Sequence, residues 1–288
     1  MVLNLGSAFE SLFPHSKRLE QGGGKVRFGQ GTYVVSKDGT GDYSSVKDAL
    51  DDISSSGGCV YIKEGIYLEP ALTLSSNVSL IGSGMSTIIR AKSGVSNLIT
   101  IGSSSANVVI ENIRFDGQHV SGSTAIFADS SIFGQKNVIR NCFFISWNFG
   151  LRFANIYSWL VCGNIFDDCF VSIKFTGECY ANSILNNLNT QWDLFWSPQA
   201  NYRFIVLDST GSYYGCTFND IVGNCESDCL GLGLEIVNTL DFKNVVVGNA
   251  FGNCTIKTLN SGGYNLISSN CSTFNLNTTD EVGHNISP

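Results

Sequence analysis

The chain has 288 residues and a formal net charge of −7. No run of Lys or Arg exceeds two residues, so nucleic acid is excluded as an expected partner, because phosphate binding needs a concentrated basic face. No stretch of 18 uncharged apolar residues occurs, so no membrane span is expected. The 31 glycines and 19 phenylalanines, without a dominance of helix-forming residues, favour an all-β protein.

The first 30 residues are predicted to be an amphipathic anchoring segment followed by a linker. Apolar residues stand at helical spacing in the first 13 positions, before Pro14 and the glycine run 22–24. Two interpretations stay open. The helix either folds back over the rest of the protein or docks through residues 1–13 onto other virion or surface proteins.

Residues 31–275 are predicted to form the main domain, and residues 276–288 a tail or cap. The segment 32–53 reads as a strand, a glycine turn and a helix with Ser44 or Ser45 as N-cap. The apolar residues on one face of this helix are Val46, Ala49, Leu50 and Ile53. We expect that face to cover the open end of a solenoid, where core and strand edges would otherwise be exposed.

A short pattern recurs between Val108 and Phe274: two or three apolar residues, a spacer, an Asn, and a further apolar or aromatic residue. The marker residues are Asn112, Asn141, Asn164, Asn187, Asn224, Asn249 and Asn270, at steps of 29, 23, 23, 37, 25 and 21. A period in the low twenties with period-two alternation predicts a single-stranded parallel β-helix, a solenoid of short strands. Each marker Asn is expected at a left-handed bend, with stacked copies hydrogen-bonded as a ladder.

Three segments in residues 34–89 resemble the N-terminal capping region of the pectin lyase-like superfamily, which includes pectinesterases and phage tailspikes. They read KDGTGDYSSVKDAL, GGCVYIKEGIYLE and NVSLIGSGMSTII. The resemblance implies an all-β, right-handed parallel β-helix with an N-terminal capping α-helix. It does not specify an activity, since one such architecture hosts many sites. The Asp-Phe-Ile-Phe-Gly and Leu-Gly-Arg-Pro-Trp segments of pectinesterases are missing, as are the Trp-Ile-Asp-His and Arg-x-Pro-x-x-Arg segments of pectate lyases, so no family residue is carried over.

Alternation along the later coils divides the side chains between the core and the surface. The expected inward residues are Leu151, Phe153, Ile173, Phe175, Leu234 and Ile236. The expected outward residues, lying along neighbouring coils, are Phe127, Arg152, Ser172, Lys174, Arg203, Glu235 and Lys257.

The catalytic candidates are the doublet Asp167 and Asp168, with Arg152 and Lys174 as cations. Lyases need a base with a cation or Ca²⁺, and inverting hydrolases need two carboxylates. The structural alternative is a solvated or capping acidic doublet beside an outward salt-bridge ladder. Further acidic candidates are Glu178, Asp208, Asp220, Glu226, Asp228 and Glu235. No metal or cofactor is expected apart from Ca²⁺ in the case of a lyase, because no CxxC pair exists and the three histidines lie far apart.

A long aromatic insertion covers residues 190–203. Its candidate carbohydrate-binding residues are Trp192, Trp196, Tyr202 and Arg203, since aromatic faces suit stacking on sugars or burial in a subunit contact. The alternative is a loop that folds down to shield the barrel. The ten cysteines leave a similar choice between buried thiols and short bridges such as Cys169–Cys179 or Cys225–Cys229.

The missing enzyme segments, the amphipathic start and the aromatic loop favour a non-catalytic carbohydrate-binding protein. We expect a virion spike or capsid-associated receptor-binding component at the extracellular or virion surface, homotrimeric by analogy, with a polysaccharide or cell-surface glycan as partner. The alternative is an extracellular polysaccharide-active enzyme, a lyase, glycoside hydrolase or esterase with a diverged site. A structural capsid or surface-layer module is a third interpretation.

Overall fold

In the computed structural model, the described residues are 20–21, 24–25, 31–130, 135–190, 202–210, 212, 215–226, 232–237, 243–251, 255–259, 266–268 and 277–278. The chain divides into two units, Met1–Gly31 and Thr32–Pro288. In the first unit, β1 (Glu20–Gln21) pairs antiparallel with β2 (Gly24–Lys25). The predicted anchoring segment 1–13 lies outside the described residues.

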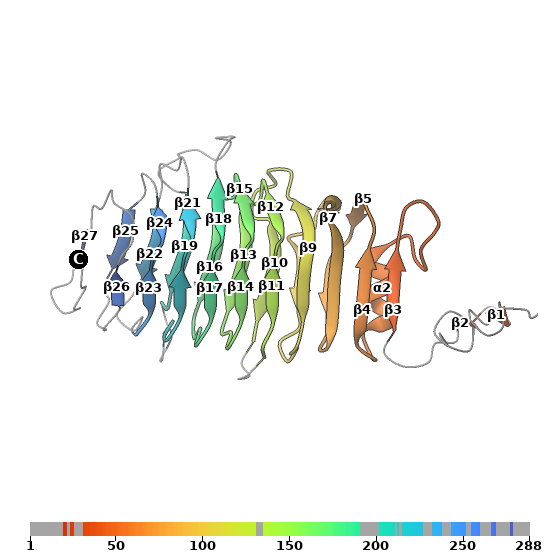
Figure 1. The fold of residues 1–288 in the computed structure, drawn as a ribbon, viewed down its shortest axis with the longest axis horizontal. Helices are drawn as coiled ribbons and strands as arrows, with labels where there is room; N and C mark the ends of the chain where they lie inside the picture. Colours follow the sequence, from red (N-terminus) through yellow and green to blue (C-terminus); the bar gives the residue numbers. More distant parts are fainter. Residues whose placement is uncertain are drawn as a thin grey trace, which may run out of the picture. The chain divides into compact units, whose positions relative to one another are not determined.

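The second unit is a stack of coils whose strands form three faces (Figure 1). The first face contains β3 (Thr32–Val35), β4 (Gly58–Ile62), β11 (Val138–Arg140), β14 (Leu160–Cys162), β17 (Ser183–Leu185), β20 (Asp220–Val222), β23 (Val245–Val247) and β26 (Leu266–Ser268). The second contains β5 (Gly65–Glu69), β12 (Phe143–Ile145), β15 (Ile165–Asp167), β18 (Leu188–Thr190), β21 (Cys225–Glu226) and β24 (Ala250–Phe251). The long strands β7 (Val78–Ala91) and β9 (Val109–Asp116) contribute to both faces.

The third face contains the strands on which the sequence predicts the outward residues. It contains β6 (Leu72–Leu74), β8 (Asn97–Ile101), β10 (Thr124–Asp129), β13 (Phe149–Ala154), β16 (Val171–Thr176), β19 (Arg203–Asp208), β22 (Leu232–Val237), β25 (Thr255–Leu259) and β27 (Asn277–Thr278). Pairing on all three faces is parallel, with each strand beside its counterpart one coil away. The predicted β-helix is therefore confirmed.

The helix α2 (Val46–Ile53) packs on this unit as the sequence predicts. Ser45 is its N-cap, and the apolar face formed by Val46, Ala49, Leu50 and Ile53 is buried. The carboxylate of Glu69 accepts hydrogen bonds from the Val46 amide at 2.8 Å and from the Ser45 hydroxyl at 3.1 Å. A carboxylate at the positive end of a helix stabilises it, and this one joins the helix to β5.

Each marker Asn is expected both to occupy a left-handed bend and to join a hydrogen-bonded ladder. At the bends between the first and second faces, these two roles fall on two adjacent positions. Asn112 and Asn141 occupy the left-handed bend itself, with φ of 57° and 53°. In later coils the marker follows the bend and is buried. There the side-chain amides form a ladder in which each Nδ2 donates to the next Oδ1 at 3.0 Å, through Asn164, Asn187, Asn224 and Asn249. A second ladder, at the bend that leads back to the first face, joins Asn182, Asn219 and Asn244.

Aromatic rings stack through the core in the same register. Phe115, Phe144 and Phe166 occupy matching positions on the second face, with ring centroids 5.1 and 4.9 Å apart. Leu151, Phe153, Ile173, Phe175, Leu234 and Ile236 are buried as predicted. In the described part of the chain, no helix has the length and apolar character to span a membrane.

Candidate active site at the start of the third face

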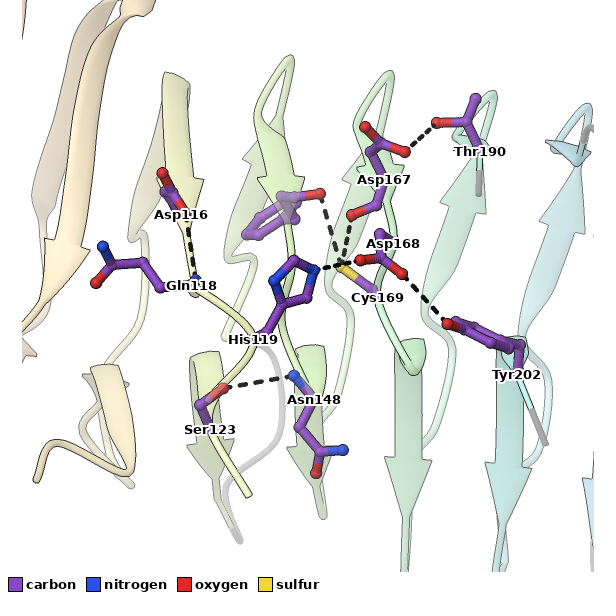
Figure 2. Close-up of polar contacts among 11 residues, drawn as sticks. Asp116, Gln118, His119, Ser123, Asn148, Asp167, Asp168, Cys169, Thr190 and Tyr202 are labelled. Carbon is purple, nitrogen blue, oxygen red and sulfur yellow. Dashed lines mark hydrogen bonds and ion pairs between the residues drawn. The ribbon is translucent and has the colours of Figure 1, made fainter. Parts of the chain in front are cut away.

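A buried carboxylate lies where the chain turns from the second face into the third. Asp168 follows β15 with φ of 50° and is only 2 % exposed. Its Oδ2 lies 2.5 Å from Nε2 of His119, and its Oδ1 accepts a hydrogen bond from the Tyr202 hydroxyl at 3.2 Å. Figure 2 shows the carboxylate held between the imidazole and the phenol. These three side chains, His119, Asp168 and Tyr202, are called the His–Asp–Tyr cluster below.

A tight loop carries His119 across an intervening coil to reach Asp168. The loop leaves β9 at Gly117, where an added Cβ would lie 2.5 Å from the Ser146 carbonyl oxygen and 2.6 Å from the Trp147 ring. Only glycine permits so close an approach. Gln118 and His119 then both adopt the left-handed region, with φ of 52° and 57°. The His119 amide donates to the Ser146 carbonyl at 2.9 Å, which fixes the loop against the next coil.

The His119 imidazole and the Asp168 carboxylate of the cluster can act together as an acid–base pair. The His119 side chain is 24 % exposed, so solvent or substrate can reach the ring, whereas the carboxylate behind it is shielded. A buried carboxylate that holds one imidazole nitrogen orients the ring and stabilises the positive charge that it gains with a proton. Tyr202 holds the second carboxylate oxygen, which leaves Asp168 a single orientation. An imidazole placed in this way suits general-base chemistry.

The other carboxylates near the cluster are engaged elsewhere. Asp116 at the end of β9 forms an ion pair with Arg90, with a separation of 2.8 Å. Asp167 accepts a hydrogen bond from the Thr190 hydroxyl at 3.1 Å on the next coil. Of the predicted doublet, therefore, Asp168 enters the cluster and Asp167 joins an outward polar pair (Figure 2).

A row of matching strand positions crosses the third face beside the cluster. Strand register places Phe127, Arg152, Lys174, Val206, Glu235 and Lys257 on successive coils. Lys174 pairs with Asp208 at 3.2 Å and Arg203 with Glu235 at 2.9 Å. The Asp208 carboxyl is partly buried, which by itself raises its pKa, but hydrogen bonds from Thr210 and the charge of Lys174 outweigh burial and lower the pKa.

Arg152 differs from the other cations of this row. Its guanidinium lies over two aromatic rings, 5.7 Å from the centroid of Phe127 and 5.5 Å from that of Phe149. Among the side chains that the structure describes, no carboxylate forms an ion pair with it. The rings hold an exposed cation in place and leave its charge available to an anionic ligand.

Several predicted site residues lie elsewhere than expected. Trp192, Trp196 and Asp228 lie outside the described residues. Tyr202 is fully buried against the ring of Phe170, so the expectation that its face stacks on a sugar is wrong. Ser172 also points inward, because its hydroxyl finds the Asn189 amide oxygen at 2.8 Å. Arg203 is on the third face but is paired with Glu235.

The remaining acidic candidates are scattered. Glu178 accepts a hydrogen bond from Tyr157, Asp220 is exposed on the first face, and Glu226 is buried in the core, where it accepts a hydrogen bond from Asn189. Within the described residues, no group of three or more His, Cys, Asp or Glu side chains is arranged to hold a metal ion. Cys169 and Cys179 are free, buried thiols that flank opposite ends of β16, so for this pair the structure supports buried thiols and not a bridge.

Sequence reasoning missed His119. It considered the histidines only as metal ligands, for which they lie too far apart. The one available signal was the Asp116-Gly117 turn at the end of a predicted strand, which marks a loop beside the third face.

No protein-family profile matches the chain. Part of it is 42 % identical over 64 residues to a probable pectinesterase/pectinesterase inhibitor from Arabidopsis thaliana, a match that covers 22 % of this chain and 12 % of that protein. The chain therefore matches about an eighth of the length of this curated relative.

Similar solved structures include the pectin methylesterase from Aspergillus niger. It is 14 % identical, with a TM-score of 0.59 and coverage of 91 % of this chain and 92 % of that one. The pectin methylesterase PemA from Erwinia chrysanthemi is 11 % identical, with a TM-score of 0.54 and coverage of 91 % and 94 %. The catalytic domain of a GH87 α-1,3-glucanase in complex with nigerose is 14 % identical, with a TM-score of 0.57 and coverage of 84 % and 47 %.

These comparisons correct the leading expectation from the sequence. The named relative and structural neighbours are enzymes that act on polysaccharides, and none of these three structures is a spike, so the prediction of a non-catalytic virion component is wrong. The alternative, an enzyme, agrees better with them. With coils, cap and neighbours in agreement, the chain has the pectin lyase-like, right-handed parallel β-helix fold.

Proposed function

We propose that this protein is an enzyme that hydrolyses ester groups on an acidic polysaccharide, with His119 as general base. The observation that carries the proposal is the His–Asp–Tyr cluster, in which a shielded carboxylate holds a solvent-accessible imidazole at 2.5 Å. A single imidazole–carboxylate pair suits activation of water better than glycosidic cleavage, which commonly uses two free carboxylates. The nearby Asp116 is already paired with Arg90.

The residues of the cluster would act in sequence. His119 accepts a proton from a water molecule while that water attacks the ester carbon, and Asp168 stabilises the resulting imidazolium. The tetrahedral intermediate then expels the alcohol, which leaves with the proton returned by His119. The products are an alcohol and a carboxylic acid, which releases its proton to solvent to become a carboxylate, so atoms and charge balance without a further reactant.

The position of Arg152 favours an acidic polysaccharide as the substrate. Its guanidinium is fixed on the outer side of the third face by two rings, and the face borders the cluster. A planar guanidinium matches the geometry of a sugar carboxylate. The similarity in part to a pectinesterase, and in fold to pectin methylesterases, makes methyl-esterified pectin the first substrate to try.

The test uses purified protein with methyl-esterified pectin, de-esterified pectin, alginate and α-1,3-glucan, and follows released alcohol, new reducing ends and unsaturated products separately. We expect alcohol release from the esterified substrate. His119→Asn and Asp168→Asn should lower it by about 100-fold or more. Asn suits the left-handed backbone at both positions.

Glu64→Gln is the matched control, since it removes an exposed carboxylate between β4 and β5 that belongs to neither proposed site. Alcohol release that persists in both cluster variants would refute the assigned role of His119. Reducing ends or unsaturated products without alcohol release would replace ester hydrolysis with chain cleavage.

A further inference from the structure

Two exposed aromatic rings lie at the far end of the third face, away from the His–Asp–Tyr cluster. Tyr180 is 40 % exposed and Phe218 is 42 % exposed, and their ring centroids are 5.0 Å apart with a tilt of 53°. Asp168 lies before the start of β16 and Tyr180 beyond its end, so the six-residue strand separates them by roughly 20 Å. The two rings are called the aromatic platform below.

The backbone at Phe218 is unfavourable for this residue type. Its φ is 56°, in the left-handed region that bulky side chains rarely adopt. The bend is left-handed in the neighbouring coils as well, where it holds Ala181 and Lys243, and Phe218 places a bulky aromatic side chain at this position. With 42 % of the residue exposed, packing in the core does not account for a phenylalanine here. A strained residue that keeps its ring on the surface indicates a role in binding.

The surroundings of the platform resemble a sugar-binding surface in their chemistry. The Lys243 ammonium lies 5.0 Å from the Phe218 ring centroid, and Asp220 is exposed two residues further along the chain. Tyr180 forms a parallel bridge with Tyr157, whose hydroxyl donates to Glu178 at 3.3 Å. Aromatic faces with polar groups at their rim fit the C–H face and hydroxyls of a pyranose.

We propose that Tyr180 and Phe218 form an accessory binding site for the polysaccharide chain, remote from the reacting group. The two rings come from adjacent coils, which lie about 4.8 Å apart, so neighbouring sugar units of one chain would each meet a ring. A protein partner fits less well, because stable protein interfaces need roughly 1,000 Å² or more of buried surface and this platform offers two side chains. The choice of a sugar ligand depends on the proposed function.

The experiment measures binding and turnover separately. Binding of the protein to long polysaccharide is followed by affinity electrophoresis, and turnover is followed on short soluble oligomers of the same material. Tyr180→Ala and Phe218→Asn should each weaken binding about fivefold and leave turnover of short oligomers unchanged. Phe218→Asn should also keep or raise the thermal midpoint, because Asn tolerates the left-handed backbone.

Ile66→Ala is the control, since Ile66 is 51 % exposed on β5 and belongs to neither site. Unchanged polysaccharide binding in both platform variants would overturn the proposal. A monomer–dimer equilibrium that the same variants abolish would overturn it in favour of self-association. If His119→Asn still binds polysaccharide while the unmodified protein shows no turnover, the ester-hydrolysis proposal fails and the platform stands.

Discussion

The buried Asn ladder is predicted to be a major source of stability, and Asn187→Ala tests it. Asn187 is 1 % exposed. Its Oδ1 accepts from the Asn164 amide and side chain, and its Nδ2 donates to the Val161 carbonyl and Asn224 Oδ1, each at 3.0 Å. Alanine leaves two buried backbone groups, the Asn164 N–H and the Val161 C=O, without these partners.

Each such group costs about 1–3 kcal/mol, so we expect a loss near 4 kcal/mol, or roughly a thousandfold in the unfolding constant. Urea unfolding, followed by far-ultraviolet circular dichroism and by the fluorescence of the buried Trp147 and Trp159, measures this loss. The adjacent variant Asn186→Gly is the control. Asn186 is exposed at φ of 53°, and the corresponding bends hold Gly163 and Gly223, so its cost should stay below about 1 kcal/mol. Equal losses in the two variants would refute the ladder argument.

Four further predictions concern the core, the thiols, pH and the cluster. Phe153→Asp should abolish cooperative unfolding of the β signal, because it places a charge between the rings of Trp159 and Phe175; a folded variant of normal stability would contradict this. In the native protein Cys225 should be alkylated rapidly and Cys142 should not, because Cys225 is exposed while burial raises the pKa of Cys142 to about 12. Mass spectrometry of peptides measures the alkylation of each thiol. The lowered pKa of Asp208 contributes stability that is fully present above the ordinary pKa range of a carboxyl and is lost as the pH falls through the lowered pKa of the folded state. The urea midpoint of Asp208→Asn should therefore change less between about pH 5 and pH 2 than the urea midpoint of the unmodified protein. Tyr202→Phe should lower turnover about tenfold or less without loss of fold, since it removes one hydrogen bond to Asp168 and keeps the buried ring; an unchanged rate would remove Tyr202 from the cluster's function.

Local chemistry made much of the fold predictable from the sequence. The capping helix follows from Ser45 and its four spaced apolar residues, all of which are buried as expected. Strand alternation correctly placed residues such as Phe153 and Ile236 inward. Alternation failed at Ser172, since a small hydroxyl can face the core when a buried amide such as Asn189 offers a partner there.

The candidate site was only half predictable. Asp168 stood out as part of an acidic doublet, but its partner His119 is 49 positions earlier in the chain. Their meeting depends on the path of the loop after Gly117, which crosses a whole coil, and no periodic pattern encodes that path. Tyr202 was chosen for an exposed ring, whereas its contribution is a buried hydroxyl.

The loop that carries His119 over an intervening coil also limits how this protein can change its length. Coils stack through nearly equivalent pairings, so a duplicated coil beyond Tyr202 would extend the stack and leave the cluster intact. A coil duplicated between residues 124 and 167 would instead move Asp168 one layer further from His119, by about 4.8 Å, and break their contact. Insertion or deletion of a whole coil should therefore be tolerated on the C-terminal side of the cluster, whereas the same change between His119 and Asp168 should disrupt the cluster.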